Sequence, residues 1–118
     1  MSPKDAVEAL AALAHEHRLS VYRLLVEAGP EGLNAGAIAQ RLGLPPSSLT
    51  FHLQHLHRAE LITQQRNSRQ LIYAADFAVM NYLVGYLTEN CCAASTGCES
   101  SCAPAPASKK ASRKSRAA

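Results

Sequence analysis

The segment that constrains the fold most is residues 44–62. Its apolar residues Leu49, Leu53 and Leu56 recur at spacings of four and three, which is the period of one face of an α-helix. Because proline is favoured in a first helical turn, we expect this helix to begin at Pro46. A helix of this kind buries its leucine stripe and leaves its other face for solvent or a ligand.

That other face is short, polar and nearly free of acid, which suits insertion into the major groove of DNA. Just upstream, Asn34 is a candidate cap for a short helix ending near Leu42, and Gly43 makes a tight connection. Two short helices joined by a turn that contains glycine are typical of a helix-turn-helix, although an ordinary αα-hairpin remains the alternative. The polar face consists of Ser47, Ser48, Phe51, Gln54, His55 and Arg58.

The segments on either side of residues 67–69 alternate in a way that is typical of strands. Residues 62–66 and 70–74 therefore predict a β-hairpin with a polar turn between them. Arg66 and Arg69 lie at its tip without a nearby acid, which favours contact with DNA phosphates. A hairpin that follows a helix-turn-helix occupies the place of a wing, and a solvated hairpin with no role in binding is the alternative.

Helical periodicity predicts further helices before and after these elements. Ser2 and Pro3 are suited to begin a helix over residues 3–13, and a second helix covers about 15–28, where we expect His15 and His17 to be solvated rather than to bind a ligand. The last helix, capped by Asp76 and extending to about residue 89, is apolar almost all round. We therefore expect it to pack both on its own domain and, with the first helix, against a second copy of the chain. The predicted fold class is mainly α with a small β-hairpin: a homodimeric winged helix-turn-helix.

Length and charge indicate how the 118 residues are divided. We expect residues 1–92 to form a DNA-binding and dimerisation domain, and 93–118 to form a segment with cysteines and a basic, disordered tail. The tail holds five of the 12 basic residues, so seven basic and nine acidic residues remain outside it. Global charge is therefore weak evidence for binding to nucleic acid.

The sequence shows no signal peptide and no apolar run of about 18 residues, so we expect a cytoplasmic protein without a membrane span.

The four cysteines all fall within residues 91–102. In a reducing compartment such a cluster indicates metal binding or redox sensing rather than a structural disulfide framework. Thiolates are soft ligands: As(III) or Sb(III) takes three of them in a pyramid, whereas zinc takes four ligands in a tetrahedron. Cys91, Cys92 and Cys98 form the tightest group and Cys102 is a candidate fourth ligand, so the number of thiolates leaves both ions open.

The position of Cys98 limits how far the last helix can extend. In a continuous helix Cys91 and Cys98 would lie about 10 Å apart along the axis, too far to share one ion. We therefore expect the helix to end near Cys92 and residues 93–97 to fold back, with Gly97 easing the turn. A tail whose cysteines have no role is the alternative.

The order of these elements resembles the ArsR/SmtB family of dimeric winged-helix repressors. Two motifs carry the resemblance, Ala-Leu-Ala-His-Glu-His-Arg-Leu at 12–19 and Ser-Ser-Leu-Thr-Phe-His-Leu at 47–53, and it covers about residues 5–92. It implies a homodimer, formed through the first and last helices, that binds operator DNA without a cofactor and releases it when an inducer binds. The expected DNA-binding residues are Ser47, Ser48, Thr50, Phe51, Gln54 and His55, with Arg66 and Arg69 on phosphates, while His52 lies nearer the leucine stripe and is expected to be structural.

Members of this family carry inducer sites in different places. The thiolate pair in the helix before the recognition helix would fall at Asn34 and Gly36, and the zinc site of the last helix would need histidines near Ala78, so both sites are absent. The remaining candidate ligands are the cysteines after the last helix, and their spacing looks like that of arsenic-responsive members with C-terminal cysteines. The resemblance therefore implies As(III) or Sb(III) as inducer, bound by Cys91, Cys92 and Cys98.

Three other functions remain open from the sequence. The same repressor could respond to zinc or cadmium, or to oxidation, with a disulfide or persulfide joining Cys98 or Cys102 to one of the adjacent cysteines. An enzyme or metallochaperone would use the cysteines to carry metal. The sequence shows neither an acid/base pair nor a substrate pocket, so we do not expect an enzyme.

We predict that truncation after about Cys102 preserves operator specificity but lowers overall affinity. A mobile cationic arm contacts phosphates without reading bases, and each phosphate it neutralises adds about 0.9 to the slope of log affinity against log salt. Titrations of full-length and truncated protein across salt concentrations should give a shallower slope after truncation. Equal slopes would show that the tail is inert in binding. The basic residues concerned are Lys109, Lys110, Arg113, Lys114 and Arg116.

Overall fold

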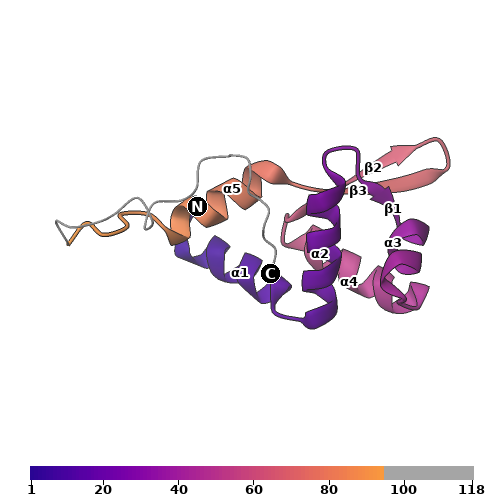
Figure 1. Cartoon of the computed structure of the whole chain (residues 1–118), viewed down its shortest axis with the longest axis horizontal. Helices are drawn as coiled ribbons and strands as arrows, with labels where there is room; N and C mark the ends of the chain where they lie inside the picture. The colour runs from indigo at the N-terminus through magenta and orange to yellow at the C-terminus, as the bar shows by residue number, and fades with distance from the viewer. Residues whose placement is uncertain (95–118) are drawn as a thin grey trace. The chain divides into compact units, whose positions relative to one another are not determined.

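A computed structural model of the chain describes residues 1–94. The chain divides into two units, Met1–Tyr86 and Leu87–Ala118, and each is considered by itself. The predictions that concern Cys98, Cys102 and the basic tail lie outside the described residues. The elements follow the order α1 (Pro3–Leu13), α2 (Glu16–Ala28), β1 (Leu33–Asn34), α3 (Ala35–Leu42), α4 (Pro46–Arg58), β2 (Ile62–Asn67), β3 (Gln70–Ala75) and α5 (Phe77–Leu87) (Figure 1).

The first two helices begin at side-chain caps. Ser2 forms a capping box with Asp5 at the start of α1, and Pro3 occupies the first turn, as predicted. At the start of α2 the His15 Nδ1 accepts a hydrogen bond of 3.1 Å from the backbone N–H of His17. The corner between α1 and α2 is therefore held by a histidine cap.

The predicted helix-turn-helix is confirmed. The Asn34 side chain accepts a hydrogen bond of 2.7 Å from the N–H of Ala37 and so begins α3. Gly43 ends α3 in the left-handed conformation, with φ +67°, which glycine adopts without strain. Helix α4 then begins at Pro46.

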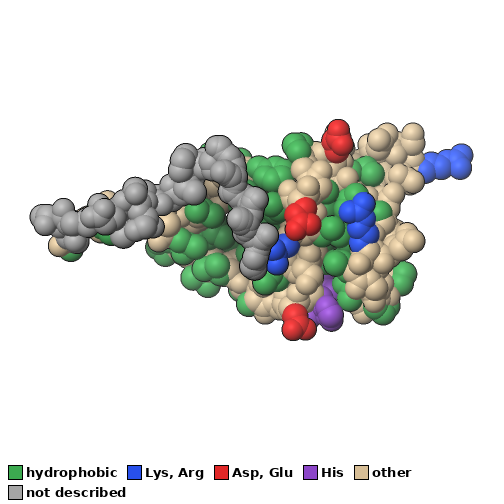
Figure 2. All heavy atoms as spheres, in the orientation of Figure 1, with side chains coloured by type: hydrophobic (Ala, Val, Ile, Leu, Met, Phe, Trp, Pro, Cys, Tyr) green, Lys and Arg blue, Asp and Glu red, His purple; other side chains and the backbone are tan. Residues whose placement is uncertain are grey.

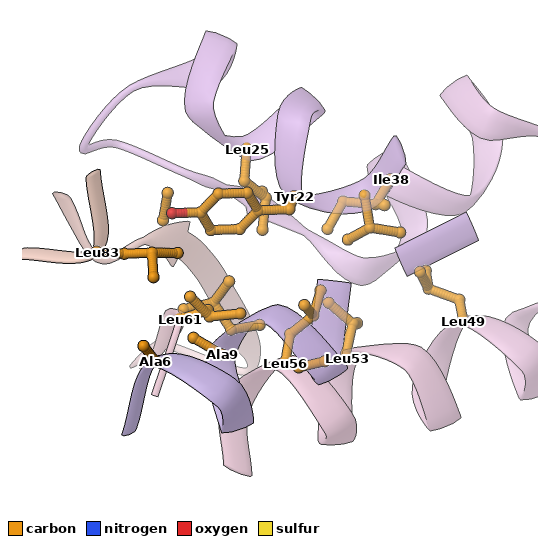
Figure 3. Close-up of a cluster of buried hydrophobic side chains, with 14 residues drawn as sticks. Ala6, Ala9, Tyr22, Leu25, Ile38, Leu49, Leu53, Leu56, Leu61 and Leu83 are labelled. Atoms are coloured by element: carbon orange, nitrogen blue, oxygen red, sulfur yellow. The ribbon is translucent and has the colours of Figure 1, made fainter. Parts of the chain in front are cut away.

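The leucine stripe of α4 forms the centre of the hydrophobic core. Leu49, Leu53 and Leu56 are at most 2% exposed. Figure 3 shows side chains from α1, α2 and α3 converging on this stripe, with Leu25 from α2 and Ile38 from α3 among them. Because this burial fixes the rotation of α4, it also determines which side chains face solvent.

The hairpin of β2 and β3 is present where it was predicted, and a third strand was missed. Strand β1 pairs with β3, placing Leu33 opposite Tyr73 and giving the sheet order β1-β3-β2. A Cβ on Gly32 would collide with the backbone carbonyl of Tyr73, and the φ of Gly32 is +71°. A two-residue strand has no period to detect, so only this glycine could have indicated the close approach.

Helix α5 begins as predicted and ends slightly earlier. The Asp76 carboxylate accepts a hydrogen bond of 3.2 Å from the N–H of Val79. The helix ends at Leu87 rather than near residue 89 or Cys92, and turns follow to residue 94. Asn90 and Cys92 have φ of 61° and 62°, values that a helix cannot contain.

None of the helices within residues 1–94 has both the length and the apolar composition that a membrane span requires.

We predict that Leu56→Ala lowers the free energy of unfolding by about 2–5 kcal/mol, because it leaves a cavity at a side chain with 0% exposure. Phe51→Ala, on the opposite face of the same helix, should cost roughly 0.5–1 kcal/mol since Phe51 is 55% exposed. Urea unfolding at one fixed protein concentration measures both changes. Equal losses for the two variants would contradict the orientation of α4.

Candidate nucleic-acid interface and cysteine site

The side chains predicted to contact DNA lie on the solvent side of α4. We call this surface the outer face. Five of its six members are exposed and His55 is half-buried. The outer face consists of Ser47, Ser48, Thr50, Phe51, Gln54 and His55.

Two of these residues have contacts that restrict their side chains. The Thr50 hydroxyl donates a hydrogen bond of 3.0 Å to the Pro46 carbonyl, so its oxygen remains available as an acceptor. The Phe51 ring packs edge-on against His55 with centroids 4.6 Å apart. An exposed aromatic ring held in this way is suited to apolar contact with a thymine methyl group.

The beginning of α4 is suited to bind a phosphate group. Its N-cap, Pro45, makes no side-chain capping hydrogen bond, and the first turn contains no acidic residue. The first backbone N–H groups of a helix have no partner within it and carry the positive end of the helix dipole. The exposed hydroxyls of Ser47 and Ser48 lie in this same turn.

The wing presents its arginines to solvent. Only the first residue of β2 is buried, and Arg66 pairs with Leu71 near the turn. Arg66 and Arg69 are both exposed, and Figure 2 shows a basic side chain extending beyond the body of the protein at the hairpin. Between α4 and the wing runs a groove of about 520 Å³, lined by Thr50, Leu53, Gln54, His57, Arg58, Gln64, Leu71 and Tyr73.

Behind the outer face lies a cluster of histidines whose contacts the sequence did not reveal. His52 is 6% exposed, in keeping with a structural position. His15 and His17 are exposed, as expected of solvated residues, yet their ring centroids lie 4.8 and 5.7 Å from that of His52. Burial, and secondarily the positive groups around it, lowers the pKa of His52 below its usual value. In the sequence, His15 and His17 at a helix start and His52 near the leucine stripe gave only a weak signal of this cluster. Their spacing along the chain does not show that the three rings meet.

The adjacent cysteines lie in the turns of the second unit. The Cys91 and Cys92 sulfurs are 3.5 Å apart, longer than the roughly 2.05 Å of a disulfide bond. The N–H of Cys91 donates to the Thr88 carbonyl at 3.0 Å, which fixes this turn. Two thiolates that each lie about 2.3 Å from one ion must be within about 4.6 Å of each other, and this pair meets that limit.

Residues 1–94 contain no group of three or more histidine, cysteine or carboxylate side chains placed so that they could hold a metal ion together. Cys98, the third predicted ligand, lies outside this range. The residues predicted to contact DNA belong to Met1–Tyr86 and the adjacent cysteines to Leu87–Ala118. The structure thus brings the predicted contacts of α4 and the wing into one unit, and two of the predicted thiolates into the other.

Comparison with known proteins agrees with this architecture. Residues 13–65 match a family model described as a helix-turn-helix domain. The chain is 26% identical to an ArsR-like transcriptional regulator from Rhodococcus sp. RHA1, with a TM-score of 0.63 and 71% of this chain and 76% of that chain covered. The chain has an ArsR-like winged helix-turn-helix fold.

Two other relatives extend the comparison. The nodulation protein NolR of Rhizobium meliloti is 29% identical over 80 residues, and the match covers 68% of this chain but only 63% of NolR. The homodimeric winged helix-turn-helix DNA-binding domain of Mb0332 from Mycobacterium bovis shares the fold at 23% identity, with a TM-score of 0.58 over 75% of this chain and 82% of that one. The chain therefore shares its fold with transcriptional regulators that contain a helix-turn-helix.

We predict that Arg66→Ala and Arg69→Ala each weaken DNA binding to a similar extent on every sequence. Phosphate contacts carry no base information, and each one lost should lower the salt slope of log affinity by about 0.9. Titrations at several salt concentrations, on operator and on random DNA, measure this. The matched control is Arg23→Ala, an exposed arginine on α2 outside the interface. A salt slope that neither wing variant changes would rule out the phosphate role.

Proposed function

We propose that this chain is a dimeric transcriptional repressor that binds operator DNA and releases it when As(III) or Sb(III) binds Cys91, Cys92 and Cys98. The observation that carries the metalloid part is the pair of thiols 3.5 Å apart on one turn. The DNA-binding part is supported by the outer face of α4 and the basic wing.

Operator recognition divides between these two surfaces. Gln54 and the serines at the start of α4 have the polar groups that hydrogen bonds to base edges require, and Phe51 offers apolar contact. Arg66 and Arg69 supply phosphate contacts that fix the position of the protein on the duplex without reading sequence. Base recognition and electrostatic attachment are therefore properties of different side chains.

Exposed apolar side chains on α1 and α5 support the dimer. Val7 and Leu10 on α1 are 63% and 41% exposed, and Tyr82 and Val84 on α5 are 64% and 47% exposed. Figure 2 shows hydrophobic side chains gathered over these two helices. Contiguous apolar surface on a small domain indicates an interface. A two-fold axis through this surface would pair each α1 and α5 with its copies and place two α4 helices on successive half-sites.

The thiol pair matches a soft, thiophilic ion. Each of two neighbouring thiolates donates one bond to As(III) or Sb(III), and the pyramidal geometry of these ions requires only one more. Cys98 is the proposed third ligand. The inducer would then favour a dimer whose half-site spacing no longer fits the operator. Because such coupling is reciprocal, operator DNA must weaken metalloid binding by the same factor.

Two other inputs would use the same sulfurs. Oxidation would join one of the adjacent cysteines to Cys98 or Cys102, and zinc or cadmium would recruit a fourth ligand. In both alternatives the chain is still a repressor, and only the signal that releases it from DNA differs. The number of thiolates that the response requires, and its dependence on an oxidant, distinguish them from the metalloid site.

We predict that Cys92→Ser retains operator affinity but abolishes release by arsenite, because the variant loses one of three thiolates. Fluorescence anisotropy of labelled operator, titrated with arsenite in the presence of reductant, measures both properties. Release of the variant at the wild-type arsenite concentration would refute a three-thiolate site.

Cys102→Ser is the matched control and should respond to arsenite normally. Loss of its response would support a four-thiolate, zinc-like site instead. Release of wild-type protein by diamide but not by arsenite would support the redox alternative.

A further inference from the structure

His52 is an ionisable side chain of α4 with 6% of its surface exposed. Its Nδ1 is enclosed and has no hydrogen-bond partner in the described part of the chain. Buried polar atoms without a partner are few in folded proteins, and each one calls for an explanation. The neutral imidazole tolerates this position better than the charged form, because a buried charge without a partner is far more costly.

A run of aromatic rings connects His52 to the α1–α2 corner on one side and to the outer face of α4 on the other. On one side it meets His15 and His17 of the α1–α2 corner, at centroid distances of 4.8 and 5.7 Å. On the other side it meets Phe51 at 5.9 Å, and Phe51 in turn packs against His55 at 4.6 Å. His52 therefore lies between a fixed corner and two members of the outer face.

The corner itself is held in place by two hydrogen bonds. The His15 Nδ1 caps α2 by accepting from His17, and the Arg18 Nε donates to the Ala12 carbonyl at 2.6 Å. This arrangement fixes positive or potentially positive groups around His52. Within residues 1–94, every charged group with a resolved effect on His52 is basic: His15, Arg18 and His17 from the corner, and His55 from α4.

We propose that His52 is a positioning residue, which in its neutral form holds the outer face of α4 against the α1–α2 corner and releases that hold when it takes up a proton. A protonated ring would be a buried charge surrounded by other positive groups. Movement of α4 away from the corner relieves both penalties and displaces Phe51 and His55. The effect on operator binding rests on the proposed function, whereas the effect on stability does not.

The direction of the pH dependence follows from linkage. Burial, with His15, Arg18, His17 and His55, lowers the folded-state pKa of His52 below its ordinary value of 6.5. The unfolded chain then binds more protons than the folded chain as the pH falls below about 6.5, so stability is present above that pH and is lost below it. Operator affinity should fall in the same range. A histidine that merely contacted phosphate would give the opposite result, since its protonated form binds DNA more tightly.

The test compares the full-length wild-type chain with His52→Asn, with the double variant His15→Asn/His17→Gln, and with His57→Gln. Asparagine at position 15 retains a capping acceptor for α2. His57 is an exposed histidine on the same helix and outside the cluster, so its variant is the control for the pH dependence of stability; because His57 lines the groove beside the wing, its variant is not a control for operator affinity. The pKa of each histidine by NMR, the urea stability and the operator affinity are measured from pH 8 to pH 5.5 at constant ionic strength.

We expect wild-type operator affinity to fall below pH 6.5, by at most about tenfold per pH unit because one proton is taken up. The urea stability of His57→Gln should follow that of the wild type at every pH. The double variant should raise the pKa of His52 and flatten the pH dependence of both affinity and stability. His52→Asn should abolish this pH dependence. If that variant does not fold, the result for the double variant tests the proposal.

A wild-type affinity that rises as the pH falls would overturn the proposal, as would a double variant with an unchanged pH profile. If the chain binds no DNA at any pH, the proposed function fails. The positioning role is then judged by stability alone, and equal pH dependence of unfolding in wild type and double variant would overturn it.

Discussion

Burial of the leucine stripe of α4 is the interaction on which the other features depend. Leu49, Leu53 and Leu56 are enclosed by α1, α2 and α3, and this packing leaves only one rotation of the helix available. At about 1.5–3 kcal/mol for each fully buried leucine, the stripe outweighs any single polar contact at the surface. The outer face is thus a consequence of the core rather than an independent feature. A change that rotated α4 would expose leucine and withdraw the proposed DNA contacts together.

The β-sheet and the α1–α2 corner each hold one part of the helix-turn-helix in place. Strand β1 directly precedes α3, and its pairing with β3 joins the helix-turn-helix to the wing; Asn34 caps α3 and also donates to the Gln70 side chain at 3.4 Å. At the other end, the histidine cap of α2 meets α4 through His52. The side chains proposed to contact DNA are therefore positioned largely by backbone pairing and helix packing, and Phe51 is held in addition by its ring contact with His55. This suits a surface whose own hydrogen-bonding groups are proposed to contact DNA.

Much of the fold could be predicted from the sequence because its signals were local. Ser2, Asn34 and Gly43 act as caps in the positions that their chemistry favours, and α1 has the predicted boundaries. Strand β1 was missed because two residues have no period. The end of α5 was predicted slightly too late: Asn90 and Cys92 adopt positive φ, and Asn90 was a usable stop signal because asparagine favours that conformation. The meeting of His15, His17 and His52 also escaped prediction, because it depends on how α2 packs on α4. The DNA and metalloid residues remain predictions, supported by exposure and by the distance between two sulfurs.

The central claim is that the outer face of α4 reads the operator sequence. Its most direct test is the ratio of operator to random-DNA affinity, using an operator selected from random sequence, for wild type, Gln54→Ala and the control Gln40→Ala, an exposed glutamine on α3. A bidentate contact to a base contributes about 1–3 kcal/mol of discrimination, so Gln54→Ala should reduce the ratio by roughly five- to 150-fold. The control should leave the ratio unchanged. A ratio that Gln54→Ala does not alter, or that Gln40→Ala reduces equally, would contradict the account.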